Sequence, residues 1–343
     1  MNIKLNNISS LDLFRGIAGY GVAICHFYYY LYNLNNFQFY SNFFVEFFFV
    51  LSGFVLFPQL HRVYNNTKNI RIFYFRRWFR TIPPYLVALL LYSILFSKFD
   101  SDTLKYLFFI QNITYNFVDF DYFYVAWSLS IEEFFYLLFP FFLIVFNKRK
   151  FVHIVILFIL IIYGLKIVYL ILNVDGEFYR IGTFLRLDSI AFGVLTRIYF
   201  EKIGNSLINT LSIILVAVSM SYFIQDFKNL TTMELFLFVL LTQYISINLI
   251  IIFINFDKLI VNKYLISFFA LLSKQTYSIY LFHFMIIYLI KLNNFLLNYE
   301  FIFIFYLIFL FLFSSLFYYV LEKNIIKNRP IYKDNNTSTK LIL

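Results

Sequence analysis

Long apolar stretches separated by short polar segments fill almost the whole of this 343-residue chain. Each stretch holds roughly 20 residues, which as a helix is long enough to cross about 30 Å of hydrocarbon. A helix also pairs its own backbone groups, as a bilayer requires. The pattern predicts an all-α, polytopic integral membrane bundle of about ten transmembrane helices, at residues 8–32, 40–60, 82–97, 127–146, 151–172, 182–200, 206–225, 233–254, 265–290 and 301–321.

Composition supports this class and excludes a soluble globule. Hydrophobic residues make up 62% of the chain and charged residues 13%, against about 45–50% and about 25% in soluble domains. The single cysteine, Cys25, excludes an intramolecular disulfide framework and any multi-cysteine metal site. The net charge of +10 matches the basic cytoplasmic loops of a membrane protein, so nucleic acid is not an expected partner.

The distribution of charge orients the chain in the membrane. With the N-terminus inside, most Lys and Arg residues fall in inward segments, whereas the outward loops carry acidic residues such as Asp100, Asp119 and Glu177. The positive-inside rule then places both termini in the cytoplasm. We expect one membrane domain, residues 1–331, and a short cytoplasmic tail, residues 332–343. We expect no extracytoplasmic domain after the last span.

Polar residues inside the first span are the first candidates for chemistry, because a charge within a span is costly and usually has a partner or a function. Arg15 and His26 are eleven residues apart. This spacing places them within about 20° on one helix face and about 16.5 Å apart in depth. Glycines between them, such as Gly19, allow a neighbouring helix or a thin ligand to approach closely. The alternative is that Arg15 reaches to the membrane surface and His26 makes only a core hydrogen bond.

Later spans add carboxylates and a second intramembrane histidine. Glu46 precedes FFFVLSGF, and the adjacent pair Glu132–Glu133 lies in WSLSIEEFFYLLFP. The two members of this pair point about 100° apart on a helix, so they are not an acid/base couple. Asp188 stands beside Arg186, where charge neutralisation within the bundle is the favoured interpretation. His283 is interpreted as a buried hydrogen-bonding residue rather than a catalyst.

A basic segment, HRVYNNTKNIRIFYFRRWFRTIPPY, forms the predicted first cytoplasmic loop. Arg76 and Arg80 would share one helical face, with Arg77 beside them. Guanidinium groups form forked, charge-assisted bonds with phosphate oxygens, so this segment is a candidate phosphate site. Positive-inside topology and contact with anionic membrane lipid are the alternative explanations. No Walker loop and no GxGxxG, GxSxG or HExxH motif supports nucleotide hydrolysis, dinucleotide, serine-hydrolase or zinc-protease chemistry.

Seven segments follow one another in a recognisable order. They are Arg15-x10-His26 after LD, FFFVLSGF (47–54), FYFRRWFRTIPPYL (73–86), WSLSIEEFFYLLFP (127–140), RLDSIAFG (186–193), TYSIYLFHF (276–284) and VLEK (320–323). Together they resemble the membrane acyltransferase-3 family, bacterial inner-membrane O-acyltransferases that modify surface polysaccharides. The resemblance spans nearly the whole chain. Asn324 departs from the proline that the family often carries after the last segment.

The resemblance implies ten helices and an enzyme of the bacterial inner membrane. This enzyme would transfer an acyl group, most simply acetyl, from cytoplasmic acyl-CoA to a sugar hydroxyl of a surface glycan such as lipopolysaccharide O-antigen, capsule or exopolysaccharide. Acyl-CoA is then the donor substrate, and no bound cofactor, metal or ATP is expected because the thioester carries the activation. The expected acceptor is a membrane-associated glycan.

In this hypothesis His26 is the general base, because a neutral imidazole is suited to removing a hydroxyl proton near neutral pH. An acyl-histidine intermediate is the less favoured variant. Glu46 or Glu132 would orient or charge-stabilise the imidazole. The catalytic candidates are therefore His26, Arg15, Glu46 and Glu132, and the candidates for binding CoA phosphates are Arg15, Arg76, Arg77 and Arg80.

A protein of another class would use the same features differently. A transporter or lipid-linked glycan exporter also has many spans and buried charges. It would be expected to show inverted repeats or broken helices in matching halves, and the sequence shows neither.

Overall fold

Helices and their connecting loops make up the part of the chain that the computed structural model describes, which is residues 8–114, 122–172, 174, 176–203, 211, 214, 216–218, 220–225, 227–293 and 299–332. The helices are α1 (Ser9–Tyr32), α2 (Asn36–Asn65), α3 (Asn69–Phe96), α4 (Ser101–Leu107), α5 (Ala126–Val145), α6 (Phe151–Ile171), α7 (Gly176–Ile181), α8 (Leu187–Ile203), α10 (Ser221–Gln225), α11 (Thr232–Phe256), α12 (Lys263–Leu292), α13 (Tyr299–Phe317) and α14 (Lys323–Lys327). A π-helical turn, Tyr318–Glu322, joins α13 to α14.

Six of the described helical segments are long and apolar enough to cross a membrane: α2, α3, α5, α6, α11 and the continuous segment Glu300–Lys327. The protein is therefore an all-α, multi-pass membrane protein, but the count of ten spans is not confirmed. Helices α1 and α12 have 24 and 30 residues, which is long enough for a span, but polar side chains on the faces that they turn to the bundle lower their mean hydropathy. The span predicted at 206–225 lies partly outside the described residues.

The segment predicted as the first cytoplasmic loop is mostly helical, because α2 and α3 extend beyond the predicted spans 40–60 and 82–97. Only residues 66–68 separate α2 from α3, and Arg76, Arg77 and Arg80 lie inside α3. Packing explains the difference, because Phe73 is fully buried and ties the start of α3 to the bundle. Pro83 and Pro84 lie within α3 rather than before it.

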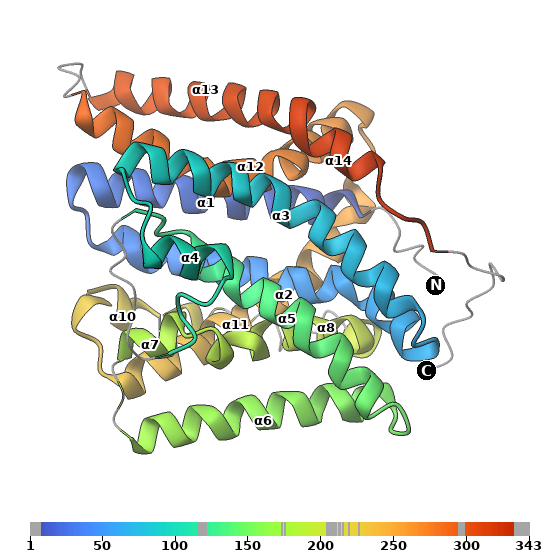
Figure 1. Cartoon of the computed structure of the whole chain (residues 1–343). Helices are drawn as coiled ribbons and strands as arrows, with labels where there is room; N and C mark the ends of the chain where they lie inside the picture. The colour runs from blue at the N-terminus through green and yellow to red at the C-terminus, as the bar shows by residue number, and fades with distance from the viewer. Residues whose placement is uncertain are drawn as a thin grey trace.

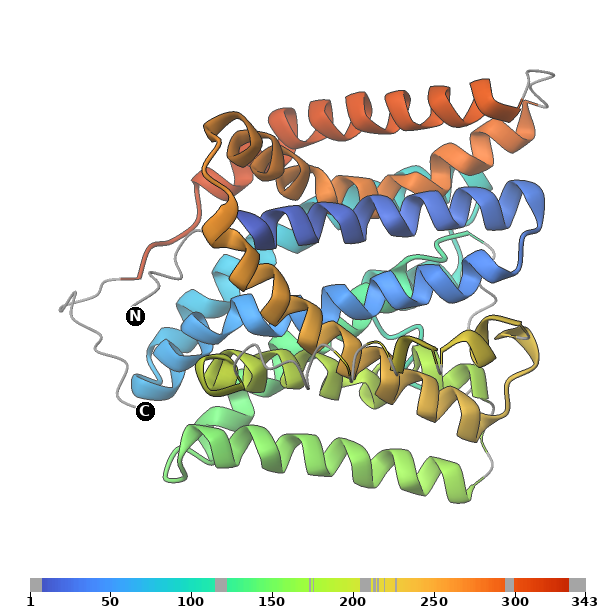
Figure 2. The same ribbon diagram turned by 180° about the vertical axis from the view of Figure 1, so that it is seen from behind.

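The helices lie side by side, with α13 along one edge of the molecule and α6 along the opposite edge (Figures 1 and 2). Helix α1 packs mainly against α12 and α2, and α2 packs mainly against α8 and α1. The start of α1 and helix α14 lie at one end of the bundle, here named the α14 end (Figure 1). Helices α7 and α10 lie at the other end, here named the α7 end.

The contact between α2 and α8 depends on two glycines. A Cβ atom at Gly53 would lie 1.8 Å from the carbonyl oxygen of Ile190, and one at Gly193 would lie 1.9 Å from that of Val50. Because both neighbours are backbone atoms, neither can move aside for a side chain. The two helices therefore pack backbone to backbone, as small residues allow within membranes.

Candidate active site

Helices α1 and α12 run parallel and in a fixed register. Arg15 Nη1 donates a hydrogen bond to Ser273 Oγ at 2.9 Å, Gly19 lies against Thr276, and His26 meets His283. A Cβ at Gly19 would lie 2.9 Å from Thr276 Cγ2, so the glycine permits this close approach. The structure thus places Arg15 and His26 on the face of α1 that contacts α12, as their spacing predicts.

The partner of His26 is a second histidine. Nδ1 of His26 lies 2.8 Å from Nε2 of His283, and Nδ1 of His283 lies 3.0 Å from the carbonyl oxygen of Ile279. His26 is 6% exposed and His283 is fully buried. The sequence singled out His283 only as a core residue, because one sequence does not reveal which positions of two distant helices meet. We call this pair the histidine dyad.

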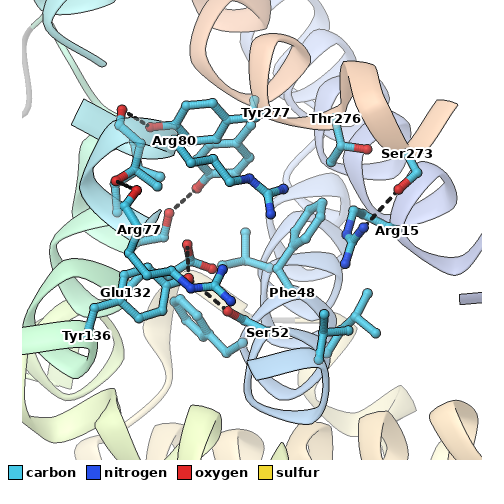
Figure 3. Close-up of a pocket in the computed structure, with 18 residues that line it drawn as sticks. Arg15, Phe48, Ser52, Arg77, Arg80, Glu132, Tyr136, Ser273, Thr276 and Tyr277 are labelled. Atoms are coloured by element: carbon cyan, nitrogen blue, oxygen red, sulfur yellow. Dashed lines mark hydrogen bonds between the residues drawn. The ribbon is translucent and has the colours of Figure 1, made fainter. Parts of the chain in front are cut away.

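A cleft lined by three arginines opens beside the same helix pair (Figure 3). Its empty space is about 850 Å³, a volume that includes open solvent at its mouth. Arg15 comes from α1, whereas Arg77 and Arg80 come from α3. Figure 3 shows the guanidinium groups reaching the cleft from two sides. Such an arrangement suits an anionic ligand with several phosphate groups.

A hydrogen-bonded group from α2 and α5 forms another wall of this cleft. Tyr136 donates to Glu132 Oε2 at 3.2 Å, and its hydroxyl lies 3.1 Å from Ser52 Oγ. The guanidinium carbon of Arg77 lies 5.5 Å from the centre of the Tyr136 ring, a cation–π contact. Glu132, a candidate for orienting His26, is therefore held among the arginines and Tyr136 (Figure 3).

The cleft and the histidine dyad are joined by Tyr280. Tyr280 lines the cleft together with Ser128, and these two hydroxyl groups are hydrogen-bonded to each other. The ring of Tyr280 also lies 5.9 Å from that of His283. Tyr280 therefore contacts both the cleft and the dyad, although neither histidine is among the residues that line the cleft.

Arg76 differs from Arg77 and Arg80. Its Nη1 donates to the carbonyl oxygen of Pro330 at 2.7 Å, and its guanidinium lies over the ring of Tyr332. It is not among the residues that line the cleft. Of the three arginines predicted to bind phosphate from this helix, Arg77 and Arg80 thus line the cleft and Arg76 does not.

Positive charge is concentrated at the mouth of this site. Arg329 lies just beyond the last membrane-crossing segment, and burial together with the nearby Arg80, Arg76 and Arg77 lowers its pKa to about 10. These cations repel one another, so an anion that binds among them is attracted by all of them.

Glu46 is paired elsewhere in the bundle. Its Oε2 accepts a hydrogen bond from Arg186, and both side chains are buried. Arg186 also donates to the carbonyl oxygen of Arg180 at 2.8 Å. Glu46 therefore holds α2 to the start of α8. In the part of the chain that the structure describes, it makes no hydrogen bond with either imidazole.

Asp188 forms a second buried ion pair, with Lys166 of α6 at 2.5 Å. Gln243 of α11 also donates to Asp188, at 3.0 Å. Asp188 and Arg186 are thus neutralised by neighbouring helices rather than by each other. Sequence reasoning passed over Lys166 because it lies in an otherwise apolar run, although a lysine there is itself a signal of a buried partner.

Arg180 is another residue whose importance the sequence did not show. It lies in α7, is 1% exposed, donates to Asn42 Oδ1 at 2.5 Å and is ion-paired with Glu177. Its guanidinium also lies over the ring of Trp127, 5.4 Å from the ring centre. Arg180 therefore ties α7 to α2 and to the start of α5. Among the described residues, no group of three His, Cys, Asp or Glu side chains is placed to hold a metal ion.

Fold and site together define a multi-pass membrane protein with an arginine-lined cleft, one of whose lining residues, Tyr280, contacts a buried histidine pair. The family model described as "Acyltransferase domain", that of the acyltransferase 3 family, matches residues 8–322. The chain belongs to this family, as its motifs predict.

Two relatives from Staphylococcus aureus illustrate the similarity. A protein of strain COL named "Putative O-acetyltransferase" is 28% identical over 321 residues, which cover 83% of this chain and 51% of the relative. O-acetyltransferase OatA of strain NCTC 8325 is 31% identical over 212 residues, 55% of this chain and 34% of the relative. The chain spans about half the length of the first of these relatives. No solved structure matches it.

Proposed function

We propose that this protein is a membrane O-acyltransferase that moves an acyl group, most simply acetyl, from acyl-CoA to a sugar hydroxyl of a surface glycan. The observation that carries this proposal is the proximity of the cleft to the histidine dyad. Three arginines line one part of the cleft, and Tyr280 joins the cleft to the histidine dyad. Acyl-CoA has the same order of parts, with phosphates at one end and the reactive thioester at the other.

Each part of the cleft has a function in this proposal. Arg15, Arg77 and Arg80 bind the CoA phosphates through charge-assisted hydrogen bonds. Apolar lining residues such as Phe48 and Leu129 contact the less polar arm that carries the thioester. Glu132 is negatively charged and does not bind phosphate. It offsets part of the positive charge of the cleft and holds Tyr136 in place by accepting its hydrogen bond.

The chemical step uses Nε2 of His26 as a general base. Nε2 takes the proton of the acceptor hydroxyl while the hydroxyl oxygen forms a bond to the thioester carbonyl carbon. The carbon–sulfur bond then breaks, and the leaving CoA thiolate takes the proton back from the imidazolium. The products are the sugar ester and free CoA, and general-base assistance of this kind is typically worth about 10²–10⁴-fold in rate.

The two substrates approach from opposite ends of the bundle. The arginines lie toward the α14 end, which the positive-inside rule assigns to the cytoplasm, where acyl-CoA is available. Tyr30 and Tyr124 lie edge-on to His26, with ring centres 5.8 and 5.9 Å away. Tyr30 follows His26 in α1 and so lies toward the α7 end. A membrane-associated glycan in the bacterial inner membrane would reach the dyad from that end.

The names of the relatives support acyl transfer to oxygen, since both include the word O-acetyltransferase. The test is an assay of the purified full chain in lipid nanodiscs with radiolabelled acetyl-CoA and lipid-linked glycan extracted from host membranes. We expect label to appear in the lipid-linked fraction as an ester that mild alkali releases. Absence of ester from this fraction, with movement of the glycan across proteoliposomes, would instead favour the exporter.

A further inference from the structure

We propose that His283 is the positioning residue of the dyad: it accepts a hydrogen bond from His26 and so holds His26 in the tautomer whose Nε2 is free to take a proton. This inference rests on the proposed function, because it assigns a partner to the base of that same reaction. It starts from the two hydrogen bonds of His283.

The first bond fixes the protonation of His283. Its Nδ1 lies 3.0 Å from the carbonyl oxygen of Ile279, one helical turn earlier in α12. A carbonyl oxygen can only accept, so Nδ1 carries the proton and donates it. A neutral imidazole has a single N–H, and Nε2 of His283 therefore has a lone pair.

The second bond then fixes the tautomer of His26. Nε2 of His283 is an acceptor, and Nδ1 of His26 lies 2.8 Å from it, so Nδ1 of His26 carries the proton. The lone pair of His26 is left on Nε2, for which the described part of the chain supplies no hydrogen-bond partner. The chain of bonds from Ile279 through His283 thus leaves the base nitrogen unprotonated and unoccupied.

The reverse arrangement would require His283 to be a cation. His283 is fully buried, and its hydrogen-bond partners are a carbonyl oxygen and an imidazole. Among the described residues, no carboxylate is hydrogen-bonded to either ring. Burial of a charge without a counter-charge is costly, so the neutral arrangement is favoured. A second histidine here does what an acidic residue does in a catalytic triad: it orients the base and fixes its tautomer.

The hydrogen bond between His26 and His283 also stabilises the imidazolium of His26 that forms during turnover. When Nε2 of His26 takes the hydroxyl proton, Nδ1–H still points at the lone pair of His283, and a cationic donor makes this hydrogen bond stronger. The bond costs little reorganisation because both rings are held by packed helices. The contact between Gly19 and Thr276 sets the spacing of α1 and α12 two turns away from the dyad.

The kinetic test compares two substitutions of His283 in the full-length protein. His283→Phe fills similar space but cannot accept a hydrogen bond, and we expect kcat to fall by about 10²–10⁴-fold, the range seen when a catalytic histidine loses its orienting partner. His283→Gln keeps an acceptor oxygen, and we expect it to retain at least about tenfold more activity than the Phe variant. KM for acetyl-CoA should change by less than about twofold in both variants, because His283 does not bind the CoA phosphates. His153→Phe, at an exposed position of α6, is the matched control.

A spectroscopic test does not depend on turnover. In ¹⁵N-histidine-labelled protein, with the His26 signals assigned by their loss in His26→Ala, we expect Nδ1 protonated and Nε2 unprotonated. His283→Phe should shift His26 toward the tautomer protonated at Nε2, whereas His153→Phe should not. Wild-type His26 protonated at Nε2, or a His283→Phe variant with unchanged kcat, would overturn the proposal. If the wild type transfers no acyl group, the proposed function fails, but the spectrum still decides the tautomer.

Discussion

Replacement of His26 by alanine is expected to lower acyl transfer by about 10²–10⁴-fold, the usual contribution of a general base, without loss of the protein from the membrane. His26 contributes one imidazole to a 24-residue helix, so its removal eliminates the base and leaves the span intact. The measurement is the initial rate of ester formation from labelled acetyl-CoA, with protein abundance and the elution profile in size-exclusion chromatography followed in parallel.

The control for this variant is Cys25→Ala, which changes the adjacent buried residue of the same helix. We expect this control to keep its activity within about threefold, because Cys25 lies off the dyad and loses only one sulfur atom. More than a tenth of wild-type turnover in His26→Ala would exclude the general-base role. A residual rate that is raised by added imidazole would support it.

The joint replacement of Arg77 and Arg80 by glutamine should raise KM for acetyl-CoA by about 30–160-fold, since each glutamine offers phosphate a neutral hydrogen bond in place of a charge-assisted one, a loss of about 1–1.5 kcal/mol per site. KM for the glycan acceptor should change much less, because the acceptor approaches from the other end. Arg77 also packs over Tyr136, so Arg80→Gln alone serves as the variant with the smaller structural effect.

The structure offers a matched control for these arginines. Arg76 belongs to the same basic segment, but it is bonded to Pro330 and does not line the cleft. Arg76→Gln should therefore leave KM for acetyl-CoA within about twofold, although it removes the same charge from the same helix. An equal rise in KM for Arg76→Gln, or an equal rise for both substrates, would mean that the arginines set membrane topology or bind lipid headgroups.

Periodicity predicted the parts of this site that lie on one helix. Helical geometry alone places Arg15 and His26 on one face, because eleven residues make just over three full turns. The family motifs placed the arginine segment and the pair Glu132–Glu133 among the functional elements. The sequence did not distinguish Arg76 from Arg77, because that choice depends on which side of α3 faces the cleft.

Contacts between distant helices could not be predicted in the same way. His26 and His283 meet because α1 and α12 run parallel in a register set by Gly16 and Gly19, which the sequence of either helix alone does not specify. The buried pairs Glu46–Arg186 and Lys166–Asp188 likewise cross between helices. The count of ten spans is not confirmed, in part because α1 and α12, the helices that carry the dyad, are not among the described segments that are apolar enough to cross a membrane.

An electron cryomicroscopy structure of the wild-type protein in nanodiscs with bound CoA would show most directly whether one cleft delivers acyl-CoA to the histidine dyad. We expect density for the phosphates beside Arg77 and Arg80 and density for the CoA sulfur next to Tyr280 and His26. CoA bound outside this cleft, or with its sulfur directed away from His26, would exclude this path for the donor.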